Sequence, residues 1–252
     1  MRKGEKIYMS NVLDILREQK EMELKGNLYH ITQINFAYNT NHIEGSTLTE
    51  EQTRYIYETN TLVLEDGNSQ AKVDDIIETS NHFKLVDYML DVADKTLTED
   101  MIKEFHKILK NGTSDERKSW FNVGDYKALA NEVGGNSTSN PKDVANDMKK
   151  LLNWYNSLEK VTFEDIVKFH SDFEKIHPFQ DGNGRVGRII MFKECLKNDI
   201  IPFIILDKDK LFYYRGLNEY QHGGEKGYLT DTCLNAQDQY QKLIEKFIGD
   251  LK

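Results

Sequence analysis

The sequence contains little cysteine and little proline. Its two cysteines, Cys195 and Cys233, are too few for a disulfide framework in a chain of 252 residues, and the apolar helical run around Cys195 predicts a buried core thiol. Only three prolines are present, and proline is the residue that interrupts helices most strongly. These shortages, together with the regular mixing of charged and apolar residues, predict long helices.

Long apolar runs and excess positive charge are also missing. No stretch of about 18 apolar residues could span a membrane, and no apolar segment of a signal peptide follows the basic start MRKGEKIYMSN. The formal net charge of -9 argues against broad binding to nucleic acid or to anionic membranes, while a local basic pocket stays compatible with it. We therefore expect a cytoplasmic protein without a nucleic-acid or membrane partner.

Start and stop signals for helices recur in a composition typical of one globular domain. Thr49 with Gln52 forms a capping box, Thr98 and Thr162 suit N-caps, and Asn140 precedes a first-turn proline. Residues 126–139 are rich in Gly, Ser and Asn and predict a short hairpin. The expected fold class is all-α with one short β-hairpin. We expect helices at about 28–45, 52–65, 101–110, 144–160, 163–176 and 185–198, and helical character in the first and last 30 residues.

The most informative segment is residues 177–188, His-Pro-Phe-Gln-Asp-Gly-Asn-Gly-Arg-Val-Gly-Arg. We expect His177 just beyond a helix end, because Pro178 disfavours helical backbone at the residue before it. A neutral imidazole there is suited to accept the proton of a Ser, Thr or Tyr hydroxyl. A hydrogen-bonded structural histidine is the alternative. We interpret Phe179 as a core anchor.

The rest of this segment has the residue types that hold a phosphate. Asp181 offers the oxygen ligand that Mg²⁺ prefers, although it also suits a turn before a helix. The glycines around Asn183 let backbone N–H groups face an anion at a helix N-terminus. Arg185 and Arg188 are spaced i and i+3, so both project from one side of that first turn. A cation there costs about 0.3–1 kcal/mol unless an anion is bound, which favours binding of a polyphosphate.

A competing interpretation uses the same glycines. Gly182, Gly184 and Gly187 match the G-x-G-x-x-G pattern of dinucleotide-binding folds, and Asp207 follows about 20 residues later. That pattern has to follow a buried strand, whereas residues 169–181 are polar, helical in period and interrupted by a proline. A dinucleotide-dependent oxidoreductase is therefore a remote alternative.

Residues 177–188 resemble the signature of the Fic-domain family, His-x-Phe-x-Asp/Glu-Gly-Asn-Gly-Arg-x-x-Arg, and fill every specified position. The resemblance implies an enzyme that transfers AMP from ATP to a hydroxyl group of a target protein and releases pyrophosphate. It implies that His177 is the base and that Asp181 holds Mg²⁺. It also implies that the phosphates are bound in two groups, the α-phosphate by Gly182, Asn183 and Gly184, and the β- and γ-phosphates by Arg185 and Arg188.

Two flanking segments extend the resemblance. Gly124-Asp-Tyr-Lys followed by ALANEVGG resembles the family's flap hairpin, which docks the target segment as an added strand. A surface hairpin without function is the alternative. KLFYYRGLNEYQ resembles the adenine-side helix, with Tyr214 and Gln221 as base contacts, although relatives often carry Asn where this chain has Gln221 and a tyrosine-rich stretch also suits a core. The flap residues are Ala128, Leu129, Ala130, Asn131, Glu132 and Val133.

An upstream segment points to control of the site. LYHITQINFAYNTNHIEG predicts a helix that Gly45 ends, and Thr40-x-x-x-Glu44-Gly45 resembles the family's inhibitory motif, Ser/Thr-x-x-x-Glu-Gly/Asn. The resemblance implies that Glu44 pairs with Arg188 and takes the place of the ATP γ-phosphate, as in the class with an N-terminal inhibitory helix. The alternative is a solvent-facing Glu44 at a frayed helix end.

We therefore expect a single Fic-type domain over residues 1–252, with the inhibitory helix in about 28–45, the core in about 95–221 and a helical extension in 222–252. The expected function is a protein adenylyltransferase that Glu44 holds mostly inactive, with ATP and a target protein as partners. Removal of AMP by the same site and a non-catalytic nucleotide-sensing module stay open. Self-association and self-modification stay open as well.

Overall fold

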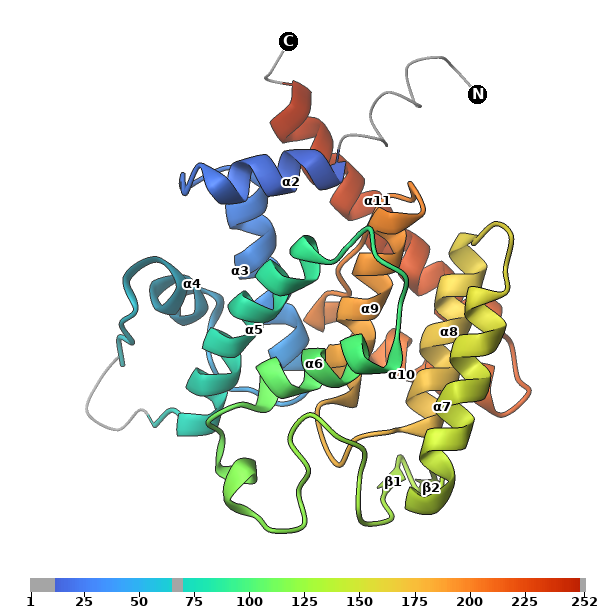
Figure 1. Ribbon diagram of the computed structural model, residues 1–252. Coiled ribbons are helices and arrows are strands. Elements are labelled where there is room, and N and C mark those ends of the chain that lie inside the picture. The colour runs from blue at the N-terminus through green and yellow to red at the C-terminus, as the bar shows by residue number, and fades with distance from the viewer. Residues whose placement is uncertain (1–11, 65–69, 250–252) are drawn as a thin grey trace.

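The computed structural model describes residues 12–64 and 70–249, and within them it is helical apart from one two-stranded hairpin (Figure 1). The expected all-α fold class with a short hairpin is confirmed. The elements are α2 (Val12–Glu21), α3 (Leu28–Ile43), α4 (Glu50–Thr59), α5 (Val73–Asp91), α6 (Glu99–Lys110), η1 (Ser114–Arg117), β1 (Glu132–Val133), β2 (Asn136–Ser137), α7 (Pro141–Asn156), α8 (Phe163–Ile176), α9 (Asn183–Lys197), η2 (Asp207–Asp209), α10 (Lys210–Gln221) and α11 (Gly227–Gly249).

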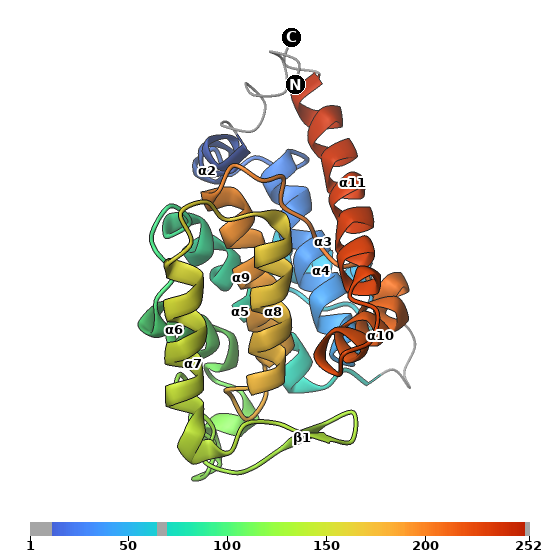
Figure 2. The ribbon, with the colours of Figure 1, turned by 90° about the vertical axis from the view of Figure 1, so that its right-hand side faces the viewer.

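Helix α9 lies at the centre of the molecule, with α8 and α7 on one side and α3 on the other (Figure 1), and α8 stands in front of it in Figure 2. Nearly all of its residues are buried, the charged ones included. A helix that is buried all round belongs to a core, and α9 packs against α3, α5, α6 and α8. Since a buried charge needs a partner, the surrounding helices must supply counter-charges to Arg185 and Arg188.

Most of the predicted helix boundaries agree with the structure. Thr49 caps α4 through the predicted capping box with Gln52, and Thr162 caps α8 in the same way. Helix α8 ends at His177, which has a left-handed backbone with φ of 52°. The helix expected at 52–65 is shorter than predicted, because Asn60 also adopts the left-handed conformation that ends helices. Residue 65 and the helical character expected in residues 1–11 lie outside the described residues.

The hairpin connects its strands through Gly134 and Gly135, which have φ of +56° and +79°. Two residues with positive φ make the tight turn that suits the twist of an antiparallel pair. No parallel sheet is present in the described residues, and Gly182 follows helix α8 instead of a strand. The dinucleotide-binding interpretation is therefore wrong. The third glycine of that pattern, Gly187, is needed for close helix packing instead, because an added Cβ would lie 2.7 Å from the His170 ring of α8.

The core of the described residues has one large cluster, to which both ends of the described chain contribute, and a smaller one of Ala37, Leu48, Ile56 and Phe83. Phe179 and Cys195 are fully buried in the large cluster, as predicted, and both cysteines are free thiols. None of the described helices combines the length and the apolar character that crossing a membrane requires.

Helix α10 packs on α11 through Gly216, which gives a test of the packing. A Cβ at this position would lie 2.7 Å from Cα and 2.8 Å from the backbone nitrogen of Leu229. We expect Gly216→Ala to lower the free energy of unfolding by about 1–3 kcal/mol, since backbone cannot yield as a side chain can. Urea denaturation measures the change. Leu211→Ala, on the same helix at a residue that is 75% exposed, should change it by less than about 0.5 kcal/mol. Equal stability of Gly216→Ala and wild type would contradict the described contact.

Candidate active site

One cavity of about 490 Å³ collects most of the residues singled out in the sequence. It is lined by the end of α3, the hairpin, the end of α8, the loop that leads into α9, and one face of α10. The residues predicted from the sequence that line it are Glu44, Val133, His177, Asp181, Gly182, Asn183, Gly184, Arg188, Tyr214 and Gln221.

His177 sits at the C-terminal end of α8, where its backbone N–H donates to the carbonyl of Phe173 at 2.9 Å. Burial, with the nearby Lys127 cation adding to it, lowers the pKa of its imidazole to about 4. The ring is therefore neutral at neutral pH, the state that a proton acceptor needs. The left-handed backbone is an uncommon conformation for a residue with a side chain, of the kind that occurs at functional sites.

A buried carboxyl group that the sequence reasoning missed lies beside this histidine. Oε2 of Glu174 is 3.8 Å from Nδ1 of His177, and Oε1 has no hydrogen-bond partner among the described residues. Burial, with Glu44 adding to it, raises the pKa of Glu174 to about 8. Because a residue three positions before His177 shares its face of the helix, the spacing alone could have placed Glu174 at the site.

The loop from Phe179 to Asn183 is closed by its own side chains. Asn183 Oδ1 accepts the N–H of Phe179 at 2.8 Å, and Asn183 Nδ2 donates to the Phe179 carbonyl at 2.9 Å. The Asn183 amide, expected at a phosphate, is thus occupied in shaping the loop. Gly182, with φ of +83°, is the N-cap of α9 and provides no side-chain acceptor. The first N–H groups of α9 are left without helical partners, an arrangement that suits an anion.

His106, which the sequence analysis did not identify, packs against the loop from Phe179 to Asn183. Its ring stacks on Phe179 at a centroid distance of 4.0 Å. The N–H of Gly124 donates to its Nδ1 at 2.9 Å, so Nε2 carries the proton and donates to the carbonyl of Asp181 at 3.1 Å. Burial, with Lys110 adding to it, lowers the pKa of His106 to about 3. A neutral ring with a fixed tautomer therefore anchors the backbone of Asp181.

The carboxylate of Asp181 is held by two cations through a single oxygen. Oδ2 accepts from Lys110 Nζ at 2.7 Å and from Arg185 Nη2 at 3.2 Å. Burial alone would raise the pKa of Asp181, but Arg185 and Lys110 outweigh it and hold the pKa well below its usual range. The side chain is half-exposed toward the cavity. This leaves Oδ1 for another ligand, and an ionised, accessible carboxylate beside the N-terminus of α9 fits a divalent cation that also binds phosphate.

The two arginines of the motif have different surroundings, although the sequence suggested one shared role. Arg185 points behind Asp181, where it pairs with Glu78 of α5 and does not line the cavity. Its third contact is Asn41 Oδ1, at 3.4 Å. Nothing in the sequence marked Glu78 as the partner that draws Arg185 away from the cavity.

Arg188 does line the cavity, and α3 holds its guanidinium. Nε donates to Thr40 Oγ1 at 2.7 Å, while Nη2 donates to the Thr40 carbonyl at 3.2 Å and to Glu44 Oε1 at 2.6 Å. Burial alone would lower the pKa of Arg188, but Glu44 outweighs it and the pKa is raised. Glu44 is the C-cap residue of α3, and a Cβ on Gly184 would collide with its carboxylate.

Tyr214 and Gln221, the residues expected to contact the adenine base, donate hydrogen bonds within the protein. Tyr214 donates its hydroxyl to the carbonyl of Ile43 at 2.8 Å, and Gln221 Nε2 donates to the carbonyl of Ser171 at 3.0 Å. Both line the cavity while they donate to backbone carbonyls. Asn218, one turn before Gln221, also lines it and was missed.

The flap divides into an anchored and an open part. Asn131 Nδ2 donates to the Phe179 carbonyl at 3.2 Å, and the N–H of Leu129 donates to Gln180 Oε1 at 3.3 Å. Of the six residues predicted as docking positions, Val133 alone lines the cavity. Glu132 and Val133 form β1 and are exposed.

The lowered pKa of His177 can be measured directly. Since its neutral form is favoured by burial, we expect the His177 ring signals to titrate with a midpoint near pH 4 in NMR spectra of the folded protein. Spectra of His177→Ala identify the signals. A midpoint near 6.5, the usual value for histidine, would contradict the described environment.

Comparisons with known proteins agree with this geometry. Residues 96–195 match the Fic/DOC family. Protein adenylyltransferase Fic of Nematostella vectensis is 30% identical over 190 residues, which cover 74% of this chain and 43% of that protein. The protein of the same name from Aedes aegypti is 28% identical over 238 residues, covering 92% and 45%. The chain thus spans less than half the length of these relatives.

Solved structures share the fold. A Fic domain containing signaling protein from Bacteroides thetaiotaomicron superposes with a TM-score of 0.68 at 23% identity, covering 94% of both chains. Fic-1 from Caenorhabditis elegans gives a TM-score of 0.70 at 21% identity, covering 96% of this chain and 72% of that one. With the signature, the fold and the assembled site in agreement, the chain is a member of the Fic/DOC family.

Proposed function

We propose that this protein transfers AMP from ATP to a hydroxyl group of a target protein. The observation that carries the proposal is the meeting of three groups in one cavity: the neutral imidazole of His177, the ionised carboxylate of Asp181, and the uncapped N-terminus of α9 with Arg188 beside it. Relatives that bear the name protein adenylyltransferase support the same activity.

The reaction asks for placement and charge neutralisation more than for covalent chemistry. The target hydroxyl oxygen bonds to the α-phosphorus, the bond from that phosphorus to the β-phosphate oxygen breaks, and pyrophosphate leaves. His177 takes the hydroxyl proton. The N–H groups at the start of α9 stabilise the α-phosphate oxygens, and Arg188 binds the terminal phosphate. Asp181 would hold Mg²⁺, which when bound neutralises phosphate charge.

In this scheme Arg185 has an indirect role. It pairs with Glu78 and Asp181 behind the cavity, so it supports the carboxylate and leaves the terminal phosphate to Arg188. The exposed edge of β1 is the part of the flap suited to pair with an extended target segment.

Glu44 would hold the enzyme mostly inactive. Its carboxylate occupies the guanidinium of Arg188 at 2.6 Å, the group that the terminal phosphate of ATP needs. If Glu44 occupies Arg188 in about 99% of molecules, the apparent affinity for the productive nucleotide complex falls roughly a hundredfold, or about 2.7 kcal/mol. Inhibition of this kind acts within one chain.

Substitutions at Glu44 and His177 test the proposed AMP transfer and its inhibition. We expect Glu44→Gly to raise AMP transfer from labelled ATP by about tenfold to a hundredfold, because Arg188 is freed, and His177→Ala in that background to abolish it. Glu23→Gly is the matched control, since Glu23 is exposed and already has φ of 52°. It should leave the rate unchanged. Label on a band of 29.4 kDa would show self-modification.

Two outcomes would favour other functions. Equal rates for wild type and Glu44→Gly would contradict inhibition, and no transfer by either protein would favour a nucleotide-sensing module. Removal of AMP is the second candidate, because Glu44 lines the same cavity as His177 and could orient a water molecule. Incubation of an AMP-modified target with wild type and Glu44→Gly separates the two reactions: removal that needs Glu44 would favour hydrolysis.

A further inference from the structure

Three carboxylates from separate parts of the chain converge behind Asp181. Glu78 comes from α5, Asp115 from η1, and Asp181 from the loop before α9, and one oxygen of each lies within 4.8 Å of the others. The ammonium group of Lys110 lies among them. Its Nζ is 2.5 Å from Glu78 Oε1, 2.6 Å from Asp115 Oδ2 and 2.7 Å from Asp181 Oδ2. The place that a cation would take is thus filled by a side chain.

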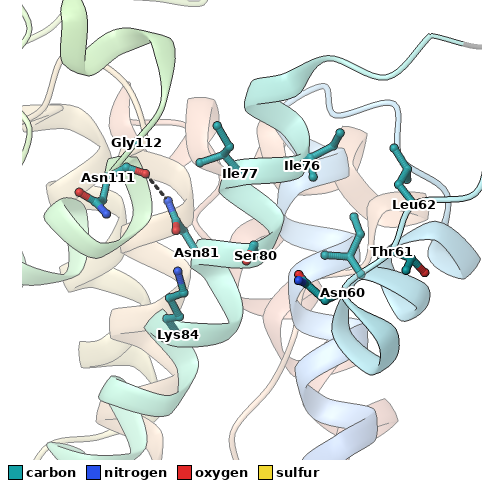
Figure 3. A pocket seen from close by; sticks show the side chains of 11 residues that line it. Asn60, Thr61, Leu62, Ile76, Ile77, Ser80, Asn81, Lys84, Asn111 and Gly112 are labelled. Atoms are coloured by element: carbon teal, nitrogen blue, oxygen red, sulfur yellow. Dashed lines mark hydrogen bonds between the residues drawn. The ribbon is translucent and has the colours of Figure 1, made fainter.

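The backbone of Lys110 is fixed as firmly as its ammonium group. Asn81 of α5 donates to the carbonyls on both sides of it, at 3.0 Å to Leu109 and at 2.7 Å to Asn111; the bond to Asn111 is the one drawn in Figure 3. The Lys110 carbonyl itself accepts from Thr113 Oγ1 at 2.8 Å. The side chain is 2% exposed. A buried side chain held at both ends has little freedom, which is what a group that orients another side chain requires.

The contact with Lys110 engages one of the two carboxylate oxygens of Asp181. Both of the cations that reach Asp181 bind Oδ2. Arg185 is shared with Glu78, and Asp115 has a second partner in Lys118 at 2.5 Å. Loss of Lys110 would remove the shorter of the two bonds that orient the Asp181 carboxylate, while the other acidic groups would keep a cationic partner.

We propose that Lys110 is a positioning residue that holds Asp181 with Oδ1 toward the cavity, in the orientation that binds the divalent cation of a metal–nucleotide complex. The proposal rests on the function proposed above. Lys110 does not line the cavity, so it acts on the metal through Asp181 and has no contact with the nucleotide.

The direction in which metal affinity changes when Lys110 is replaced distinguishes a positioning role from a purely electrostatic one. Removing a cation near a metal site should strengthen metal binding if charge alone mattered. Removing the group that orients a ligand should weaken it, typically by 10-fold to 100-fold. Lys118→Met is the matched control, because it removes the same charge from the same Asp115 but leaves Asp181 untouched.

The experiment uses the full chain with Glu44→Gly, which frees Arg188, and Mn²⁺ as the probe. Free Mn²⁺ is followed by electron paramagnetic resonance in the presence of a non-hydrolysable ATP analogue. We expect Lys110→Met to raise the Mn²⁺ concentration for half-saturation about tenfold. Binding of the analogue without metal, measured by calorimetry, should change less than about twofold. In Lys118→Met both quantities should change less than about twofold.

Several results would overturn the proposal. Mn²⁺ bound without the analogue is subtracted, because loss of the Lys110 ammonium leaves three carboxylates that could bind the ion themselves. Unchanged or tighter binding of the Mn²⁺ that requires the analogue in Lys110→Met would show that Lys110 does not orient Asp181, and an equal loss of analogue binding without metal would show a merely structural role. Lys110→Gln removes the charge but keeps a polar end group among the acidic residues, and it must weaken Mn²⁺ binding as well if Lys110→Met does not fold. Absence of Mn²⁺ and analogue binding in the Glu44→Gly parent would overturn the proposed function together with this one.

Discussion

The guanidinium of Arg188 is the group on which the arrangement of this molecule depends. It lies on the central helix α9, buried, and every strong hydrogen bond that it makes goes to α3 through Thr40 and Glu44. A buried arginine without these partners would be strongly unfavourable. The N-terminal part of the chain is therefore joined to the signature helix by the charge that the terminal phosphate of ATP needs in the proposed function, so a bound nucleotide would compete with these contacts.

Much of this could be predicted from local sequence, and the reasons are physical. Capping boxes at Thr49 and Thr162 act over four residues, so the helix starts were readable. The signature places His177, Asp181 and Arg188 at fixed spacing around one helix N-terminus, so their meeting in one cavity followed from that spacing. The dinucleotide pattern could be discounted from local sequence as well, because its glycines do not specify the element that precedes them, whereas the polar, helical period of residues 169–181 does.

What could not be predicted are the partners that arrive from distant segments. Glu78 lies 107 residues before Arg185, and Lys110 lies 71 residues before Asp181. Neither belongs to a motif, and each looks like an ordinary helix-surface charge in the sequence. These two residues give the arginines of the motif different surroundings and orient the carboxylate of Asp181. The residues that contact Arg185 and Asp181 from behind the cavity are thus brought there by tertiary packing alone.

The order of the elements along the chain has a consequence for synthesis. Glu44 precedes Arg188 by 144 residues, so α3 leaves the ribosome on the order of 10 s before the signature helix at ordinary elongation rates. The carboxylate is therefore already present when α9 packs into the core, and no ATP has to be displaced from a newly completed site. If Glu44 inhibits as proposed, each newly synthesised molecule folds into the inhibited state, and the enzyme becomes active only after Glu44 has left Arg188.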